Sequence, residues 1–333
     1  MQKHGLQADI IHYLDDFLII CPATKETTKY SAIFNNLCSQ VGLAIKVSKN
    51  EEGHVASFGG VELDTKKIVV RLPIKKLDKA RSIVQTTMEK DSLLLLDLQT
   101  ITGYLNFVAV VVPLGRTFLL RFYNMELYFP RQRRNQKRRI SREARKDLTW
   151  WAAVLTVAPE RSIIARHRHR VSTWSDAAST NGLGGFYMCE EDSGPLPVSA
   201  FSISLPPHLA KSREHINTQE MRAVEQVLLY WSEQWRGKKI LIHVDNRAVG
   251  HGIENGTIRG AAMTVLRRCL LLAAEHDLEL EAKWISTKEN ALADALSRFD
   301  SRRITDLAPH LIYPVCTLQS HGFLTYNNPA SQE

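Results

Sequence analysis

The chain has 333 residues, of which 44% are hydrophobic and 23% are charged. These proportions are close to globular averages and exclude a mainly disordered, collagenous or coiled-coil protein, while the length predicts two domains. Lysine and arginine total 43 against 35 acidic residues, so the formal net charge is +8. Gathered on one face, this surplus would predict an anionic partner, most commonly a nucleic acid.

The five cysteines lie far apart and form no CxxC pair, which argues against a disulfide framework or a zinc site. The longest apolar run, residues 107–114, is far shorter than the roughly 20 residues that a membrane-spanning helix needs. The first residues, MQKHGLQADIIHYLDD, lack the pattern of a signal peptide. We therefore expect an intracellular protein, in the cytoplasm or the nucleus, without a membrane partner.

The first half begins with two apolar arms, residues 10–13 and 17–20, around Leu14-Asp15-Asp16. This pattern predicts a β-hairpin with carboxylates at its tip. Helical spacing of apolar residues after Thr24 predicts an amphipathic helix that ends at Gly42. Three short strands and then two helices are expected next, at residues 43–47, 55–63, 68–72, 75–90 and 98–112.

The run RQRRNQKRR at residues 131–139 has the composition of a domain boundary. It has three interpretations: a grip on the phosphate backbone of nucleic acid, a nuclear localisation patch, or a solvated surface without a role. The nearby Trp150 and Trp151 fit a core better than a stacking platform. If the run is a grip, the binding residues are Arg131, Arg133, Arg134, Lys137, Arg138 and Arg139.

The second half predicts elements in the order βββαβαβα, followed by a loosely structured tail beyond Arg303. The strands are expected at residues 171–175, 184–189, 198–203, 240–244 and 278–285, and the helices at 217–235, 257–276 and 291–299.

Four acidic residues fall at the ends of these elements: Asp176, Glu220, Asp245 and Asp294. Strand ends and helix starts converge on one edge of an open sheet, so the four carboxylates are expected to share a site. Their mutual repulsion calls for hard divalent cations, and two metals about 4 Å apart are a known arrangement for attack of water on a phosphodiester.

Each acidic residue alone has an ordinary interpretation. Asp176 fits a strand end, Asp245 a turn, and Asp294 a solvated helix position. Glu220 also fits a capping arrangement in which Asn217 is the N-cap. Four together, in the right element order, favour the metal site.

Four sequence words resemble the ribonuclease H domain: WSDAAST, HINTQEMRAVE, HVDNRAV and NALADALSR. The resemblance covers about residues 171–300 and implies that Asp176, Glu220, Asp245 and Asp294 hold two Mg²⁺ or Mn²⁺ ions. It also implies an RNA/DNA hybrid as substrate and partner. One feature departs, because cellular enzymes have a histidine in the loop where this chain has residues 285–289, ISTKE.

The first half resembles the reverse transcriptase palm at Tyr13-Leu14-Asp15-Asp16, which fits YxDD, and at GLAIKVSKN and FGGVELD. The resemblance implies that Tyr13 contacts the template-primer, that Asp15 and Asp16 reach metal, and that Lys49 can protonate pyrophosphate. The ordinary alternatives are a polar hairpin tip and a solvated turn lysine. The words LPIKKLDKA and TGYLNFVAVVVPLGRTFLLRFY look like a thumb.

The whole chain thus resembles the C-terminal part of a retrotransposon reverse transcriptase, of DIRS or gypsy type. The expected fold is α/β, a ribonuclease H-like mixed sheet with flanking helices, preceded by a partial palm and a helical thumb. The expected divisions are a partial palm, a thumb, a basic connection, a ribonuclease H-like domain and a tail, at residues 1–72, 73–128, 129–170, 171–300 and 301–333.

We expect no independent polymerase activity, because a palm needs another metal-binding aspartate and fingers before the hairpin, and only twelve residues precede Tyr13. Another subunit could supply these parts. The competing hypothesis is a non-catalytic nucleic-acid-binding remnant of a retroelement. A transposase or integrase of the same fold fits less well, because the spacing around Glu220 is wrong for it.

Overall fold

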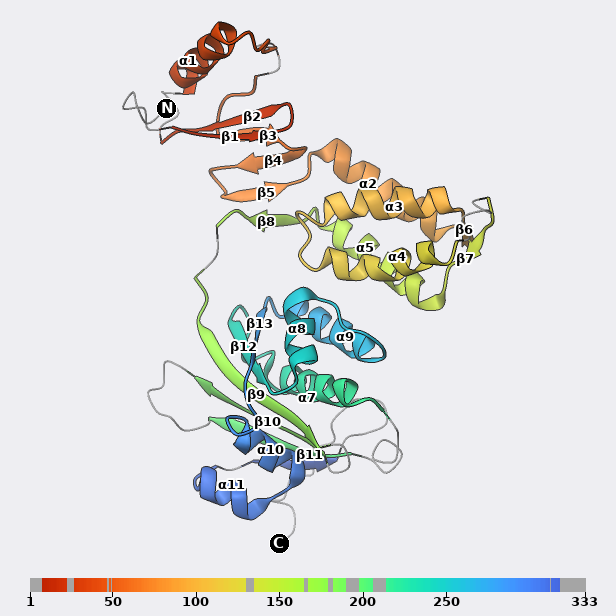
Figure 1. The fold of residues 1–333 in the computed structure, drawn as a ribbon, viewed down its shortest axis with the longest axis vertical. Helices are drawn as coiled ribbons and strands as arrows, with labels where there is room; N and C mark the ends of the chain where they lie inside the picture. Colours follow the sequence, from red (N-terminus) through yellow and green to blue (C-terminus); the bar gives the residue numbers. More distant parts are fainter. Residues whose placement is uncertain are drawn as a thin grey trace. The chain divides into compact units, whose positions relative to one another are not determined.

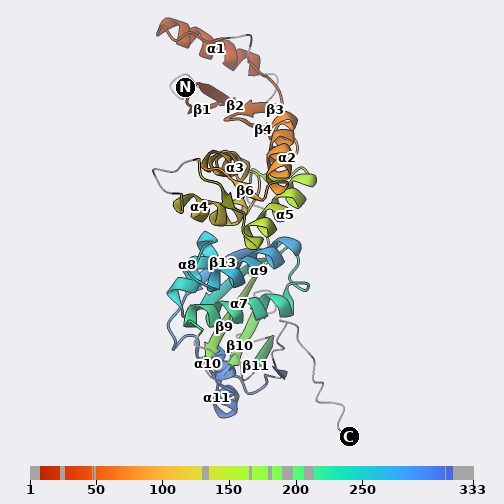
Figure 2. The same cartoon turned by 90° about the vertical axis from the view of Figure 1, so that its right-hand side faces the viewer.

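A computed structural model describes residues 8–22, 27–46, 48, 50–129, 135–164, 167–178, 182–189, 198–205, 214–311 and 313–317. The chain forms two compact units, Met1–Arg166 and His167–Glu333. Figure 1 labels their helices and strands, and Figure 2 gives a second view.

The first unit begins with the expected hairpin. Strands β1 (Asp9–Tyr13) and β2 (Asp16–Ile20) pair antiparallel, with Tyr13 opposite Asp16. The turn between them is tight, and Leu14 adopts a φ of 54°. Helix α1 (Thr27–Gln40) contacts the hairpin through Phe34, whose ring centroid lies 5.0 Å from that of Phe17.

A four-stranded antiparallel sheet follows, in the order β3-β4-β5-β8. Its strands are Val55–Phe58, Val61–Asp64, Val69–Arg71 and Glu160–Ser162. The single strand expected at 55–63 is two strands, because Gly59 and Gly60 form a turn with positive φ values of 56° and 86°. Residues 43–46 form no strand, in contrast to the expectation for 43–47.

Four helices pack into a separate core. They are α2 (Ile74–Met88), α3 (Leu95–Val108), α4 (Leu120–Leu127) and α5 (Arg142–Thr156), with a 3₁₀ turn at Gly115–Leu119. As expected, Trp151 is fully buried in this core, and Trp150 stacks on Phe118 with a centroid distance of 3.9 Å.

Part of the stretch expected as a connection, residues 129–170, belongs to this first unit. Helix α5 packs on α2, where the Arg81 guanidinium donates to the Leu155 carbonyl at 2.9 and 3.0 Å. Strand β7 (Arg138–Arg139) pairs with β6 (Ser92–Leu93), and β8 completes the sheet described above. Basic composition therefore does not mark the limit of the folded unit here.

The second unit is built on a mixed sheet in the order β13-β12-β9-β10-β11-β14. Strand β10 runs antiparallel to β9 and β11, whereas β12 runs parallel to β9 and β13. The strands are β9 (Arg170–Ala178), β10 (Gly182–Cys189), β11 (Ser199–Ser204), β12 (Lys239–Val244), β13 (Glu279–Trp284) and β14 (Val315–Thr317). The expected mixed sheet with flanking helices is confirmed.

Two helices cover opposite faces of this sheet: α7 (Ile216–Trp231) and α10 (Ala291–Arg298). A side chain at Gly184 would point into α10, and one at the next residue, Gly185, would point at Val227 on α7. Because neighbouring residues of a strand face opposite sides, the two helices must do so as well. The arrangement can be followed in Figure 1.

The single helix expected at 257–276 is preceded by a second one. Helix α8 (Arg247–Asn255) ends at Gly256, whose φ of 65° allows a left-handed C-cap, and α9 (Ala262–Glu275) follows. Part of the tail expected beyond Arg303 forms regular structure, namely the end of α11 (Ser301–Leu307) and the short strand β14, and residues 318–333 lie outside the described residues. Within the described ranges, no helix is both long and apolar enough to cross a membrane.

Candidate functional site

Asp176 lies within β9, two residues before the strand ends at Ala178, and not after the strand as expected. It pairs directly with Gly184 of β10, so its side chain faces the same side of the sheet, toward α10. It is 4% exposed. The Ser297 hydroxyl of α10 donates to Oδ2 of Asp176 at 2.6 Å.

Asp245 comes directly after β12. Since β12 and β9 are parallel, with His243 opposite Trp174, their carboxyl ends place Asp245 beside Asp176. Two contacts hold Asp245: the Trp284 indole Nε1 donates to its backbone oxygen and the Thr287 hydroxyl to its Oδ2, both at 2.9 Å.

Glu220 is the fifth residue of α7 and is 5% exposed. The capping interpretation of this segment is wrong, because the helix begins at Ile216 and His215 is the N-cap, with its Nδ1 accepting from the Asn217 N–H at 3.2 Å. Asn217 instead accepts a 2.9 Å hydrogen bond from the Asn246 side chain. The capping role therefore does not explain Glu220.

The three residues form a compact acidic group. Asp176, Glu220 and Asp245 each offer a carboxylate oxygen, and these oxygens all lie within 4.8 Å of one another. Burial, and then the charges of Asp176 and Asp245, raise the pKa of Glu220 well above its ordinary value. Burial is also the largest cause that raises the pKa of Asp176 to about 6, with the Ser297 hydrogen bond opposing it and the Asp245 and Asp294 charges adding to it.

This acidic group fits a hard divalent cation. Oxygen ligands from carboxylates are what Mg²⁺ and Mn²⁺ prefer. Oε2 of Glu220 is buried without a hydrogen-bond partner, which is costly unless something else binds it. In the part of the chain that the structure describes, no other three metal-ligating side chains come together in this way.

Asp294, the fourth acidic residue, lies beside the acidic group but outside it. It is the fourth residue of α10, and its backbone oxygen accepts a 2.9 Å hydrogen bond from Ser297. Its carboxylate is occupied by two arginines: Oδ1 accepts from Arg298 Nε at 2.6 Å and Oδ2 from Arg303 Nη1 at 2.5 Å.

Sequence reasoning missed the residues that orient these acids. Ser297 and Arg298 lie within the motif NALADALSR, so the motif could have pointed to them. Trp284, Thr287 and Arg303 belong to no motif, and nothing in the sequence indicated their contacts. Thr287 belongs to the loop 285–289 that lacks the histidine. In this loop, the Thr287 hydroxyl contacts Asp245.

The hairpin of the first unit is arranged differently. Asp15 and Asp16 are exposed, and neither joins a group of three metal-ligating side chains among the residues described. Tyr13 is 57% exposed, and its ring lies 3.8 Å from where a Cβ at Gly59 would stand, so the YLDD and FGG words are neighbours in space. Lys49 lies outside the described residues.

Three arginines of the basic run, Arg131, Arg133 and Arg134, also lie outside the described residues. Arg138 donates to the Tyr128 carbonyl at 2.8 Å, so it serves the local fold. Lys137 and Arg139 are exposed. Arg139 lines a surface pocket of about 470 Å³ at the start of α5, together with Asp91, Ile140, Ser141, Arg142 and Arg145.

No protein-family profile matches the sequence, and the comparison with curated proteins finds no relative. Among solved structures, the chain is similar to the foamy viral protease-reverse transcriptase dRH in complex with double-stranded DNA. The identity is 15% and the TM-score 0.39, over 82% of this chain and 46% of the viral one. The chain thus spans about half the length of that protein.

Two ribonucleases are also similar. Ribonuclease H1 from the archaeon Halobacterium salinarum is 18% identical over 42% of this chain and 99% of its own, with a TM-score of 0.32. LC11-RNase H1, isolated from compost and crystallised with an RNA/DNA hybrid, is 15% identical over 38% of this chain and 91% of its own, with a TM-score of 0.28.

Proposed function

We propose that the second unit hydrolyses the RNA strand of RNA/DNA hybrids, as part of a retrotransposon reverse transcriptase of DIRS or gypsy type. Asp176, Glu220, Asp245 and Asp294 are the proposed ligands of two Mg²⁺ or Mn²⁺ ions. One observation carries the proposal: the oxygens of Asp176, Glu220 and Asp245, from three separate elements, gather within 4.8 Å at the carboxyl ends of β9 and β12.

When bound, the cations activate a water for attack on phosphorus and stabilise the leaving oxygen. The protein's own part is to hold the acidic group in a fixed orientation. Ser297 donates to Asp176, and Thr287 and Trp284 fix Asp245, so the carboxylates are placed before metal arrives. Glu220 contributes the unpartnered Oε2, whose burial cost a cation would remove.

The hybrid is the proposed substrate and partner because the resemblance at four sequence words points to it. The grooves of an A-like duplex hide the base edges, so selection would depend on backbone shape and on 2′-hydroxyl contacts. Three exposed residues are proposed to contact backbone phosphates: Lys137, just before β7, and Arg139 and Arg142, in the pocket at the start of α5.

We further propose that this chain does not polymerise DNA by itself. Nucleotidyl transfer needs two metals held by several carboxylates, and the exposed Asp15 and Asp16 gather no third ligand from the described residues. A partner that supplies further metal-binding carboxylates is the proposed condition under which the hairpin and Tyr13 would take part. Incorporation of nucleotides on a primed template by the isolated chain would contradict this proposal.

The test compares three labelled substrates in Mg²⁺ or Mn²⁺: RNA/DNA hybrid, single-stranded RNA and duplex DNA. The wild-type chain is expected to cut only the RNA of the hybrid, and Asp245→Asn is expected to lose this cleavage. Equal cleavage by Asp245→Asn, or cleavage of single-stranded RNA alone, would contradict the proposal.

A non-catalytic nucleic-acid-binding module is the second candidate. It is favoured by Asp294, whose two carboxylate oxygens are both engaged by arginines. For this candidate, neither the wild-type chain nor Asp245→Asn is expected to cut the labelled hybrid. The two chains are expected to bind it with equal affinity when binding is measured on the same substrate.

A further inference from the structure

Arg303 comes from a separate helix and is held firmly beside Asp294. Phe299, at a φ of 57°, turns the chain from α10 into α11, and the Asp300 side chain caps α11 by accepting from the Arg303 N–H at 3.1 Å. One residue later, Ile304 is 2% exposed in a cluster with Leu296 of α10. The position of the Arg303 backbone is therefore fixed by a cap and by a core residue.

Both arginines can leave Asp294, but only one of them links Asp294 to another helix. Arg298 is on the same helix as Asp294, at the i,i+4 spacing, so its pair is local to α10. Its side chain is 55% exposed and that of Arg303 is 41% exposed, whereas that of Asp294 is 8% exposed. Arg303 reaches Asp294 from α11, so its guanidinium can turn outward while the cap and Ile304 keep its backbone in place.

The arginines and a second cation would compete for the same oxygens. A divalent ion on Asp294 would lie beside two positively charged guanidinium groups. Their repulsion weakens binding of the ion, and it is stronger where the charges are buried. Guanidinium binds phosphate with the same planar geometry as carboxylate. A backbone phosphate at the acidic group would therefore offer Arg303 an equivalent partner.

We propose that Arg303 is a positioning residue that occupies Asp294 in the free protein and moves to a phosphate of the nucleic acid when the hybrid binds. The proposal rests on the hybrid as substrate. The exchange frees Oδ2 of Asp294 for a second cation, so the hybrid strengthens cation binding. By linkage, the cation strengthens hybrid binding by the same factor.

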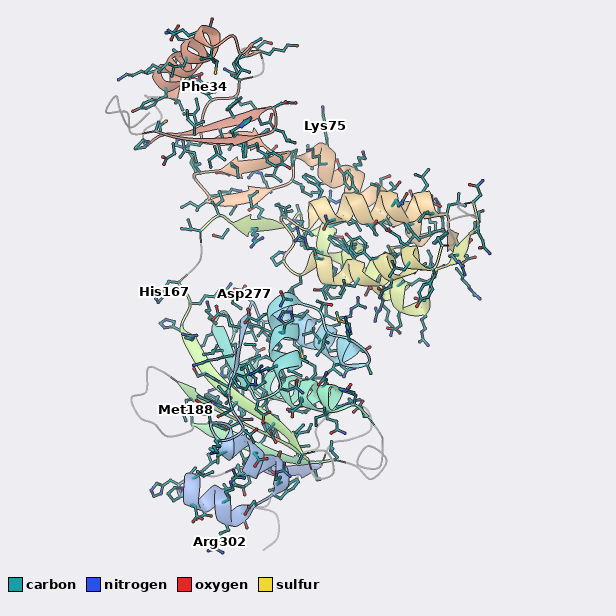
Figure 3. All side chains as sticks on the ribbon, in the orientation of Figure 1. Phe34, Lys75, His167, Met188, Asp277 and Arg302 are labelled. Atoms are coloured by element: carbon teal, nitrogen blue, oxygen red, sulfur yellow. The ribbon has the colours of Figure 1, made fainter. Side chains whose placement is uncertain are left out.

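The test titrates Mn²⁺ into the full-length chain by calorimetry without nucleic acid. Arg303→Gln is expected to bind Mn²⁺ about tenfold more tightly or to take up one more ion per chain, because Asp294 loses a competing charge. The matched control is Arg302→Gln, an exposed neighbour on α11 that is labelled in Figure 3, and its isotherm is expected to match the wild type. An Arg303→Gln isotherm identical to the wild type overturns the proposal.

A second readout is hybrid binding in EDTA, where nothing is cut. Arg303→Gln is expected to weaken binding and to lower the slope of log K against log salt by about 0.9, the value for one phosphate contact. Arg303→Lys, which keeps the charge, is expected to retain the slope. An unchanged slope in Arg303→Gln overturns the exchange with phosphate.

If Arg303→Gln is poorly folded, the wild-type chain decides. Its Mn²⁺ affinity is measured with and without a hybrid whose RNA carries 2′-O-methyl groups, after subtraction of the hybrid's own Mn²⁺ binding. Stronger binding with the hybrid is expected, and equal affinities overturn the proposal. None of these readouts needs cleavage. A chain that binds the hybrid but does not cut it would refute the proposed hydrolysis, and the binding measurements would still decide the role of Arg303.

Discussion

The Ser297 hydroxyl donates a 2.6 Å hydrogen bond to Oδ2 of Asp176, joining two residues that lie 121 positions apart. The same hydroxyl also lies 2.9 Å from the backbone oxygen of Asp294, so its one hydrogen is shared between these two acceptors. Both contacts are buried, so this one side chain connects α10 to the acidic group. The proposed chemistry depends on such contacts as much as on the acids themselves.

Replacing Ser297 by Ala is expected to weaken Mn²⁺ binding most strongly near pH 6. The Ser297 hydrogen bond opposes the rise in the pKa of Asp176, which is already about 6, so its loss raises that pKa further. Protons then compete with the cation at higher pH. The check is Mn²⁺ affinity across pH 5–8, with Thr305→Val, which removes an exposed hydroxyl bonded to the Ser301 carbonyl, as the control. If the pH at which Mn²⁺ affinity is half lost is the same in Ser297→Ala and the wild type, the role of Ser297 is refuted.

Gly184 lets α10 pack directly on β10, opposite Asp176. A Cβ at Gly184 would lie 2.4 Å from the Ser297 nitrogen and 2.5 Å from the Ala293 oxygen, so a backbone shift is needed. Gly184→Ala is expected to cost about 2–3 kcal/mol of stability and to weaken metal binding. Gly250→Ala is the control, since its Cβ would meet Val244 at an ordinary 3.4 Å. Thermal melts that fall equally for both variants would contradict this prediction.

The acidic group should make the metal-free protein less stable as pH rises. The pKa of Asp176 is 3.8 in the unfolded chain and about 6 in the folded protein, so between these pH values the folded protein keeps a proton that the unfolded chain has lost. The free energy of unfolding therefore falls as pH rises from 3.8 to about 6. The loss for Asp176 is on the order of 2–3 kcal/mol. In EDTA at pH 7.5, Asp176→Asn is therefore expected to be more stable than the wild type, and about equally stable at pH 4.

Mg²⁺ is expected to reverse this order by stabilising only the wild type, because it binds the ionised acids. The measurement is urea unfolding of both chains at the two pH values, with and without Mg²⁺. A wild-type chain that is the more stable one in EDTA at pH 7.5 would contradict the cost of burying an ionised Asp176 beside other acids.

Thr287 orients Asp245 from the loop that lacks the histidine. Thr287→Val keeps the shape but removes the 2.9 Å hydrogen bond to Oδ2, and a several-fold loss of hybrid cleavage is expected, since the acid remains but is less well oriented. Thr287→Ser keeps the hydroxyl and should restore the rate. Equal rates in the Val and Ser variants would show that the contact does not matter.

The pocket at the start of α5 should contribute to the salt dependence of hybrid binding. Arg139→Ala and Arg142→Ala are each expected to lower the slope of log K against log salt by up to about 0.9. Lys146→Ala is the control, because Lys146 is also on α5 but pairs with Glu143 at 2.8 Å. Slopes that do not differ among the three variants would remove the pocket from the proposed interface.

The sequence predicted the elements that carry the acids, because their apolar periodicity is strong. The hairpin of Asp15 and Asp16, the strand before Asp245 and the helix of Asp294 all lie where the pattern placed them. It also predicted that four acids would converge, from strand ends meeting at one edge of a sheet. Asp176, Glu220 and Asp245 do so, whereas Asp294 lies outside their group.

Local pattern could not predict contacts between distant residues. That Arg303 neutralises Asp294 depends on the left-handed turn at Phe299, a residue with no propensity for it. The position of α10 depends on the missing side chain at Gly184, which the sequence alone reads only as a weak point in a strand. Both features arise from packing, which is why they appear only in the structure.

The proposed function requires that the acidic group directs water at the RNA strand of a hybrid. The most direct measurement is mass spectrometry of RNA fragments after hydrolysis of a hybrid in H₂¹⁸O with Mg²⁺, beside Asp245→Asn. We expect one ¹⁸O in each new terminal phosphate, no 2′,3′-cyclic phosphate, and no fragments from Asp245→Asn. Cyclic phosphate ends, or the same fragments from both chains, would contradict the proposed function.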